Sequence, residues 1–309
     1  MGSMVSVELW GLFIVMVVAA LAIDLGLKSH RHRTQAVPLA EAARWTAVWI
    51  GLALIFAGVL FAMRGQQRAL EFLTGYLIEE SLSIDNMFVF IIIFQFFKIS
   101  SAQQPRVLKW GILGAVVMRF VLIFTGVSLL ERFHWIVYGF GGLLIVTAVK
   151  MVTEGEKDIH PEENALLRVF RRFVPVTAET HGEQFFIREQ GRWAATPLFA
   201  TLLVVEASDL VFALDSIPAV LAISKDPFIV FSSNVFAILG LRSLYFLVSG
   251  FLGLFRFLRY GLAIVLAFIG TKMLLSEIYP IPILVSLGVV VGVLAFTMLL
   301  SVLWKEKKT

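Results

Sequence analysis

Nine long runs of apolar residues constrain this chain more than any other feature of its sequence. Each run is about 18 to 27 residues long, enough for an α-helix to cross a hydrocarbon core about 30 Å thick. The predicted spans are residues 7–27, 43–63, 71–97, 107–130, 135–152, 196–222, 228–254, 259–276 and 281–304. Hydrophobic residues make up 59% of the chain and charged residues 16%, a balance typical of polytopic membrane proteins. The sequence therefore predicts an all-α membrane protein of about nine helices, with residues 1–309 as a single transmembrane domain.

Lysine and arginine residues gather in alternate connections between these spans. They follow the first, third, fifth, seventh and ninth spans, and the connections between are poor in them. The positive-inside rule then places the N-terminus outside and the C-terminus in the cytoplasm, which requires an odd number of spans. The net charge of +4 is explained by these connections, so we predict no nucleic-acid partner.

One connection, residues 153–195, is much longer than the others and is predicted to be cytoplasmic. Its segment 161–173 has the spacing of a helix lying on the membrane surface, and residues 185–193 alternate around a glycine like a small hairpin. His160 and His181 have no neighbour at ligand spacing, so we interpret them as solvated loop residues. The chain has no cysteine, which excludes disulfides and thiolate metal sites.

Two of the spans carry acidic residues in an otherwise apolar setting. The third holds Glu79, Glu80 and Asp85, and the sixth holds Glu206, Asp209 and Asp215. An acid at the centre of a membrane helix costs about 2.5 to 3.5 kcal/mol on translocon scales. Because such a cost needs a compensating partner or an aqueous cavity, these acids indicate a functional site.

The two acidic spans also belong to an internal repeat. EESLSIDN from Glu79 overlays DLVFALDS from Asp209 without a gap, and YGFGGLLIVTAVKM from Tyr138 overlays YGLAIVLAFIGTKM from Tyr260. The overlay pairs Glu79 with Asp209, Asp85 with Asp215, Asn86 with Ser216, and Lys150 with Lys272, with Arg119 and Arg242 in the intervening spans. Repeat one is residues 71–152 and repeat two is residues 196–276. A three-helix unit must insert upside down the second time, a plan typical of secondary transporters. Duplication of a merely structural bundle is the alternative.

These residue types restrict the chemistry of the site. Carboxylates with the side-chain oxygens of Asn86 and Ser216 form a hard-oxygen set suited to Mg, Ca or Mn. Glu206 and Asp209 share a helix face, whereas two residues six apart, such as Glu79 and Asp85, lie roughly 120° apart around an ideal helix. Either a helix break, for which Pro218 is suggestive, lets the acids converge, or they serve different parts of a path.

Structural interpretations compete with this one at several positions. Asp85 and Asp215 could form salt bridges with Arg119 and Arg242 instead of binding a metal. Asp24, in the first span, is as compatible with an interfacial acid as with a site residue. Lys150 and Lys272 are predicted to end their helices on the cytoplasmic side as anchors.

The quoted motifs carry a resemblance to a known family. FLTGYLIEESLSIDNMFVF, VVEASDLVFALDSIPA, SSNVFAILGLRSLYF and YGLAIVLAFIGTKML are similar to the TerC family of integral membrane proteins, most closely its Alx-type manganese exporters. The resemblance implies export of Mn(II) across the bacterial inner membrane. By position it also implies the metal-binding residues, which are Glu79, Asp85, Glu206, Asp209, Asp215 and, as a possible sixth, Asp24. Glu80 departs from the pattern, because some relatives have a lysine there.

The sequence thus predicts a secondary transporter, not an enzyme, that exports divalent cations, Mn(II) first, in exchange for protons. Its partners are the ion and the lipid bilayer, no cofactor is expected, and the oligomeric state is not predicted. One alternative is an exporter of another small solute, such as amino acids. Another is a non-transporting membrane partner in metal loading or in tellurium and envelope stress resistance, with residues 153–195 as its docking surface.

Overall fold

The computed structural model describes residues 7–26, 38–133, 135–153, 177, 182, 184–189, 192–250, 257–276, 278–279 and 281–303. Over these residues the chain forms nine helices and one two-stranded sheet. In chain order they are α1 (Val7–Gly26), α2 (Leu39–Arg64), α3 (Gln66–Phe96), α4 (Gln104–Arg132), α5 (Ile136–Thr153), β1 (Phe186–Glu189), β2 (Arg192–Ala195), α7 (Pro197–Leu221), α8 (Pro227–Gly250), α9 (Leu258–Leu274) and α10 (Ile283–Leu303).

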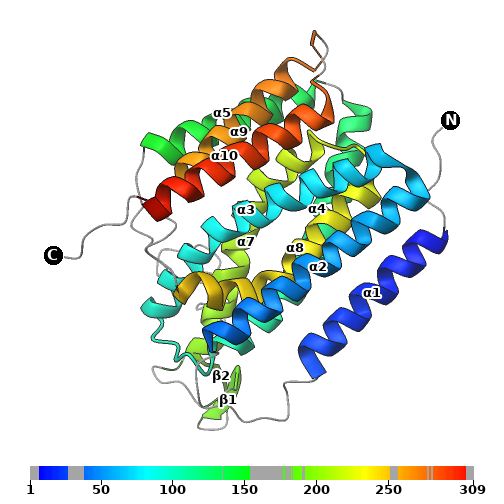
Figure 1. Cartoon of the computed structure of the whole chain (residues 1–309). Helices are drawn as coiled ribbons and strands as arrows, with labels where there is room; N and C mark the ends of the chain where they lie inside the picture. Colours follow the sequence, from blue (N-terminus) through cyan, green and yellow to red (C-terminus); the bar gives the residue numbers. More distant parts are fainter. Residues whose placement is uncertain are drawn as a thin grey trace.

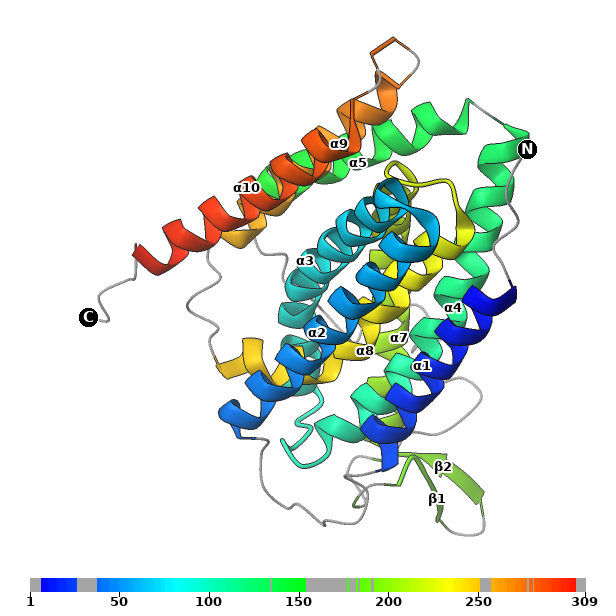
Figure 2. The same cartoon turned by 45° about the vertical axis from the view of Figure 1, so that its right-hand side comes forward.

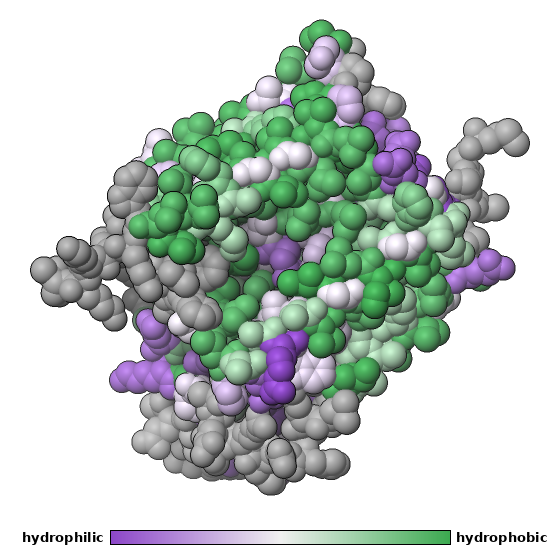
Figure 3. Space-filling view, viewed as in Figure 1, coloured by the Kyte–Doolittle hydropathy of each residue, from purple (hydrophilic) through white to green (hydrophobic). Residues whose placement is uncertain are grey.

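The helices agree closely with the predicted spans, and the all-helical polytopic membrane fold is confirmed. Within the described residues, six helices are long and apolar enough to cross a membrane, namely α2, α4, α5, α7, α8 and α10. Hydrophobic side chains dominate the face shown in Figure 3, and hydrophilic ones lie mostly toward its two ends. Many large apolar side chains are exposed on α2, α4, α5, α7 and α10, as lipid-facing surfaces require.

Helix α8 is the centre of the bundle (Figure 1). It is buried along almost its whole length and packs against α1, α2, α3 and α4. A helix that is apolar all round belongs in such a buried position. Helix α7 lies against α3 and α4, so the two acid-bearing helices α3 and α7 are neighbours at the core of the bundle.

Helices α5, α9 and α10 form a second group, which lies across one side of the bundle (Figure 2). Gly141 of α5 and Gly270 of α9 approach so closely that a Cβ atom on Gly270 would lie 2.7 Å from the Gly141 carbonyl oxygen. Near their other ends, Arg259 Nε donates a hydrogen bond to the Met151 carbonyl. The start of α5 therefore lies beside the end of α9, and the end of α5 beside the start of α9, so the two helices are antiparallel. Small residues lie where they cross.

The antiparallel packing corrects one prediction. Lys150 ends α5 and Lys272 ends α9, so the two lysines lie at opposite ends of the helix pair and not on one face. Lys150 is exposed, and Lys272 Nζ donates a hydrogen bond to Ser286 Oγ of α10 at 2.9 Å. Antiparallel packing of repeat-paired helices is what an inverted repeat requires, although the repeat itself stays a prediction.

The hairpin within the long connection is confirmed. Strands β1 and β2 pair antiparallel, with Phe186 opposite Ala195, and lie beyond one end of the bundle (Figure 1). The Arg106 guanidinium of α4 lies over the Phe185 ring, 5.2 Å from its centroid, and ties the hairpin to that end. We call this end the hairpin end. The predicted surface helix 161–173 and both loop histidines lie outside the described residues.

Candidate functional site

A buried ionic cluster joins four helices near the middle of the bundle. Arg119 of α4 is fully buried, and its Nη1 donates hydrogen bonds to Glu79 Oε1 of α3 and, at 2.6 Å, to Asn234 Oδ1 of α8. Its Nη2 donates to Asp209 Oδ1 of α7 at 3.3 Å. Each residue lies well inside its helix, where water is excluded and electrostatic interactions are strong. We call this group the Arg119 cluster.

The cluster has more negative than positive charge. Two carboxylates, Glu79 and Asp209, share one guanidinium, so one negative charge is uncompensated if both acids are ionised. Glu79 Oε2 and Asp209 Oδ2 are buried with no hydrogen-bond partner among the described residues. Buried polar atoms are normally paired, and an unpaired carboxylate oxygen is especially costly. The arrangement can therefore accept a proton or a small cation.

The cluster also shows which arginine pairing is formed. Arg119 binds the repeat-paired acids Glu79 and Asp209. The salt-bridge alternative, which paired Arg119 and Arg242 with Asp85 and Asp215, stays a prediction, because the Asp85 side chain lies outside the described residues. Asn234 was missed by the sequence analysis. The available signal was an amide inside a span that is otherwise almost wholly apolar.

Glu206 lies one turn before Asp209 on α7 and is half-buried. Both acids line a cavity of about 20 Å³ between α3, α4, α7 and α8, whose other lining residues are apolar or glycine. The prediction that Glu206 and Asp209 lie on the same face of their helix is thus confirmed, because both line one cavity. Among the described residues, Glu206 is near the Arg119 cluster but forms no hydrogen bond with it.

Asp215 lies elsewhere, against α5. Its Oδ1 accepts a hydrogen bond from Thr147 Oγ1 at 2.9 Å, and it is six residues further along α7 than Asp209. Its neighbour Ser216 is buried, and the Ser216 Oγ has no hydrogen-bond partner among the described residues. Asn86 on α3 is buried as well. The second-repeat acids are therefore divided between two places.

Two predicted site residues cannot be placed as side chains. Asp85 belongs to α3 and Asp24 to α1, but both side chains lie outside what the structure describes. Glu80 Oε2 is buried without a hydrogen-bond partner in the described part of the chain.

No helix break brings the acids together. Helix α3 runs continuously from Gln66 to Phe96, and α7 continues through Pro218. The predicted helix break is therefore wrong, and the other possibility left by the sequence, that the acids serve different parts of a path, stays a prediction. In the described residues no three His, Asp or Glu side chains are gathered for one metal ion. The Arg119 guanidinium instead lies between the acids of the two repeats.

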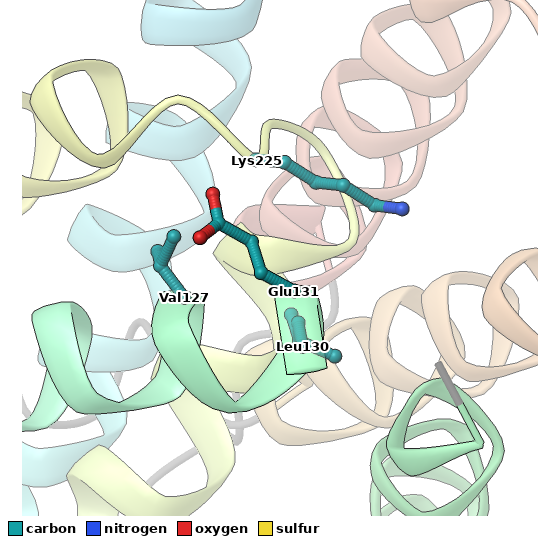
Figure 4. Close-up of a pocket in the computed structure, with 4 residues that line it drawn as sticks. All are labelled: Val127, Leu130, Glu131 and Lys225. Atoms are coloured by element: carbon teal, nitrogen blue, oxygen red, sulfur yellow. The ribbon is translucent and has the colours of Figure 1, made fainter. Parts of the chain in front are cut away.

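A larger cavity, of about 190 Å³, opens at the end away from the hairpin. Val127, Leu130, Glu131 and Lys225 line it, and the Lys225 side chain extends away from the Glu131 carboxylate (Figure 4). None of the predicted site residues lines this cavity, so it is not the candidate site.

A second ionic group lies where α2 meets α3, also at the end away from the hairpin. The buried Glu71 accepts hydrogen bonds from Arg68 Nη1 at 2.7 Å and from Ser224 Oγ at 2.6 Å. Asp226 forms an ion pair with Arg64 at 3.4 Å and accepts a hydrogen bond from the Phe228 amide at the start of α8. These contacts tie the turn after α7 to the start of α3.

We expect Glu71→Ala to lower the free energy of unfolding by about 2 kcal/mol, because hydrogen bonds to a charged group are lost and Ser224 is left unsatisfied. Thermal unfolding of the purified protein in detergent measures the change. Glu131→Ala, an exposed acid at the same end, is the matched control and should leave the midpoint unchanged. Equal midpoints for the two variants would contradict this role for Glu71.

Together, the apolar helices and the buried ionic cluster define an integral membrane protein with a polar centre. The chain belongs to the TerC family of integral membrane proteins, whose family model matches residues 63–309. The membrane protein STKORF319 of Myxococcus xanthus is 49% identical over 301 residues, covering 97% of this chain and 94% of that protein.

Several relatives carry the name "Putative membrane-bound redox modulator Alx". The one from Escherichia coli K12 is 46% identical over 301 residues, covering 95% of this chain and 94% of its own. The one from Photorhabdus laumondii is 45% identical over 315 residues, covering 99% and 98%. No solved structure matches the chain.

Proposed function

We propose that the protein is a secondary transporter that exports divalent cations, Mn(II) first, from the cytoplasm in exchange for protons. The observation that carries the proposal is the Arg119 cluster, in which two buried carboxylates from the paired repeat positions share one guanidinium. Its unpartnered carboxylate oxygens and the Asn234 amide oxygen are hard donors of the kind Mn(II) accepts.

A cation and Arg119 would compete for the same two acids. When Mn(II) binds Glu79 and Asp209, the guanidinium has to move away from at least one of them. When the metal leaves, Arg119 or a proton neutralises the acids again. Because metal ligands must be deprotonated, metal binding should release protons and weaken as the pH falls. This competition supplies a physical link between proton and metal movement.

In the proposed orientation the hairpin end faces the cytoplasm, as the distribution of lysines and arginines indicates. The protein then lies in the bacterial inner membrane with its N-terminus outside. The relatives' name suggests a redox role instead, but a thiol–disulfide cycle cannot reside in this chain, which has no cysteine. Export of a redox-active cation such as Mn(II) is compatible both with the proposed transport and with the redox role that the relatives' name suggests.

The test is Mn(II) efflux from cells that express Asp85→Asn or Asp215→Asn. Each change removes one intramembrane charge at constant size, and we expect each to abolish efflux while the protein still inserts in the membrane. Glu131→Gln, an exposed acid at a helix end, should transport normally. Wild-type efflux by either aspartate variant would defeat the proposal, and amino-acid efflux without Mn(II) efflux would favour the alternative solute exporter.

A further inference from the structure

The contact between α4 and α7 is closest where Gly114 meets Glu206. A Cβ atom built on Gly114 would overlap the Glu206 carboxyl group, whose three atoms are its nearest neighbours. A Cβ atom on Gly111, one turn earlier on α4, would instead meet Val205 Cγ1 at an ordinary distance of 3.6 Å. Two glycines on one helix face therefore differ sharply, and only Gly114 makes room for a carboxylate.

Glu206, whose carboxyl group lies where Gly114 leaves space, also lines the small cavity beside Asp209. At about 20 Å³ the cavity is large enough for one water-sized occupant, since about 10–15 Å³ suffices. Glu206 and Asp209 are its acidic lining residues, and Phe90, Leu108 and Leu241 are among its apolar ones. Asp209 Oδ2, which has no hydrogen-bond partner in the described part of the chain, is the unsatisfied group here.

Glu206 lies one turn nearer the start of α7 than Asp209, and α7 begins next to the hairpin. A cation that comes from the hairpin end along α7 therefore reaches Glu206 before Asp209. Asp209 in turn is bonded through its other oxygen to Arg119. The order Glu206, cavity, Asp209 and Arg119 forms a short polar route within apolar surroundings.

We infer that Gly114 is a positioning residue, which by carrying no side chain holds the Glu206 carboxylate beside the cavity that reaches Asp209. The inference rests on the proposed metal export. It adds the residue that positions Glu206, the first acid that a cation coming from the hairpin end would reach. Alanine at this position would displace the Glu206 carboxylate from the place it has in the structure. Because the displaced group is the far end of a flexible side chain, the protein should still fold.

The test compares Gly114→Ala, the control Gly58→Ala, Glu206→Asp and the double variant Gly114→Ala/Glu206→Asp in proteoliposomes supplied with Mn(II). We expect Gly114→Ala to raise the KM about tenfold, equivalent to about 1.4 kcal/mol of binding, with a smaller change in maximal rate. Gly58→Ala, the same change at a place on α2 where a Cβ atom would meet no atom within 4 Å, should leave the KM unchanged. The shorter aspartate makes room for the new methyl group, so the double variant should have a lower KM than Gly114→Ala alone. An equal effect of Gly58→Ala, or no recovery in the double variant, would overturn the inference.

A second measurement does not depend on transport. Residues in contact give non-additive changes in stability, so the shifts in unfolding midpoint of Gly114→Ala and Glu206→Asp should not sum to that of the double variant. Additive shifts overturn the inference whatever the transport result. A wild-type protein that moves no divalent cation contradicts the proposed function, and non-additive shifts would then still support the Gly114–Glu206 contact.

Discussion

Arg119→Gln is expected to lower the free energy of unfolding by about 3 to 5 kcal/mol, the usual cost of removing one partner from a buried ionic group. The loss arises because Glu79 and Asp209 are left with no positive charge between them. The same change should make Mn(II) a stronger stabiliser, since the cation no longer competes with a guanidinium. Thermal unfolding of the purified protein with and without Mn(II) measures both effects.

Arg132→Gln is the matched control, because Arg132 is an exposed arginine in the last turn of the same helix. It should change neither the midpoint nor the response to Mn(II). If Arg119→Gln were as stable as the control, or if Mn(II) stabilised it less than the wild type, the competition between arginine and metal would be wrong.

Asp209→Asn and Glu79→Gln should each weaken Mn(II) binding by about 10- to 100-fold, because an interaction with a charged group is worth about 1.5 to 3 kcal/mol. Each change keeps the size of the side chain and removes one negative charge from the Arg119 cluster. Similar losses are expected from the two variants, since the acids come from paired repeat positions and share one arginine. The KM for Mn(II) in proteoliposomes measures the effect.

Ser208→Ala provides the control for position, because Ser208 precedes Asp209 and its hydroxyl donates a hydrogen bond to the Val204 carbonyl of its own helix. It should transport with a normal KM. A normal KM in Asp209→Asn would show that Asp209 is not part of the metal path.

The helices could be predicted from sequence because length and apolarity determine a membrane span directly. The predicted span 71–97 corresponds to α3 (Gln66–Phe96), and 196–222 corresponds to α7 (Pro197–Leu221). The ends differ by a few residues, most where charged residues extend a helix beyond the apolar run. The prediction that Lys272 lies on the same side of the membrane as Lys150 was wrong, because a charge at a helix end does not reveal which side of the membrane that end reaches. The antiparallel packing of α5 and α9 does reveal it.

The site could be predicted only in part. The acids were identified because they are costly in lipid, but pairing depends on the rotation and neighbours of each helix, which composition does not encode. The bonds from Arg119 to Glu79 and Asp209 were therefore not predicted, and the Glu71 group was missed because helix-end acids resemble ordinary interfacial residues. Nothing in the sequence distinguishes Gly114 from Gly111, since only the packing of α4 on α7 makes them differ.

The most direct test of the central claim is divalent cation flux in proteoliposomes that contain the purified protein. Mn, Mg, Ca and Zn are supplied in turn, with a pH gradient imposed or absent, beside protein-free vesicles and the Asp215→Asn variant. We predict Mn(II) flux that an opposing proton gradient accelerates and that the variant lacks. Mn(II) flux equal to that of protein-free vesicles under both conditions would contradict the proposal.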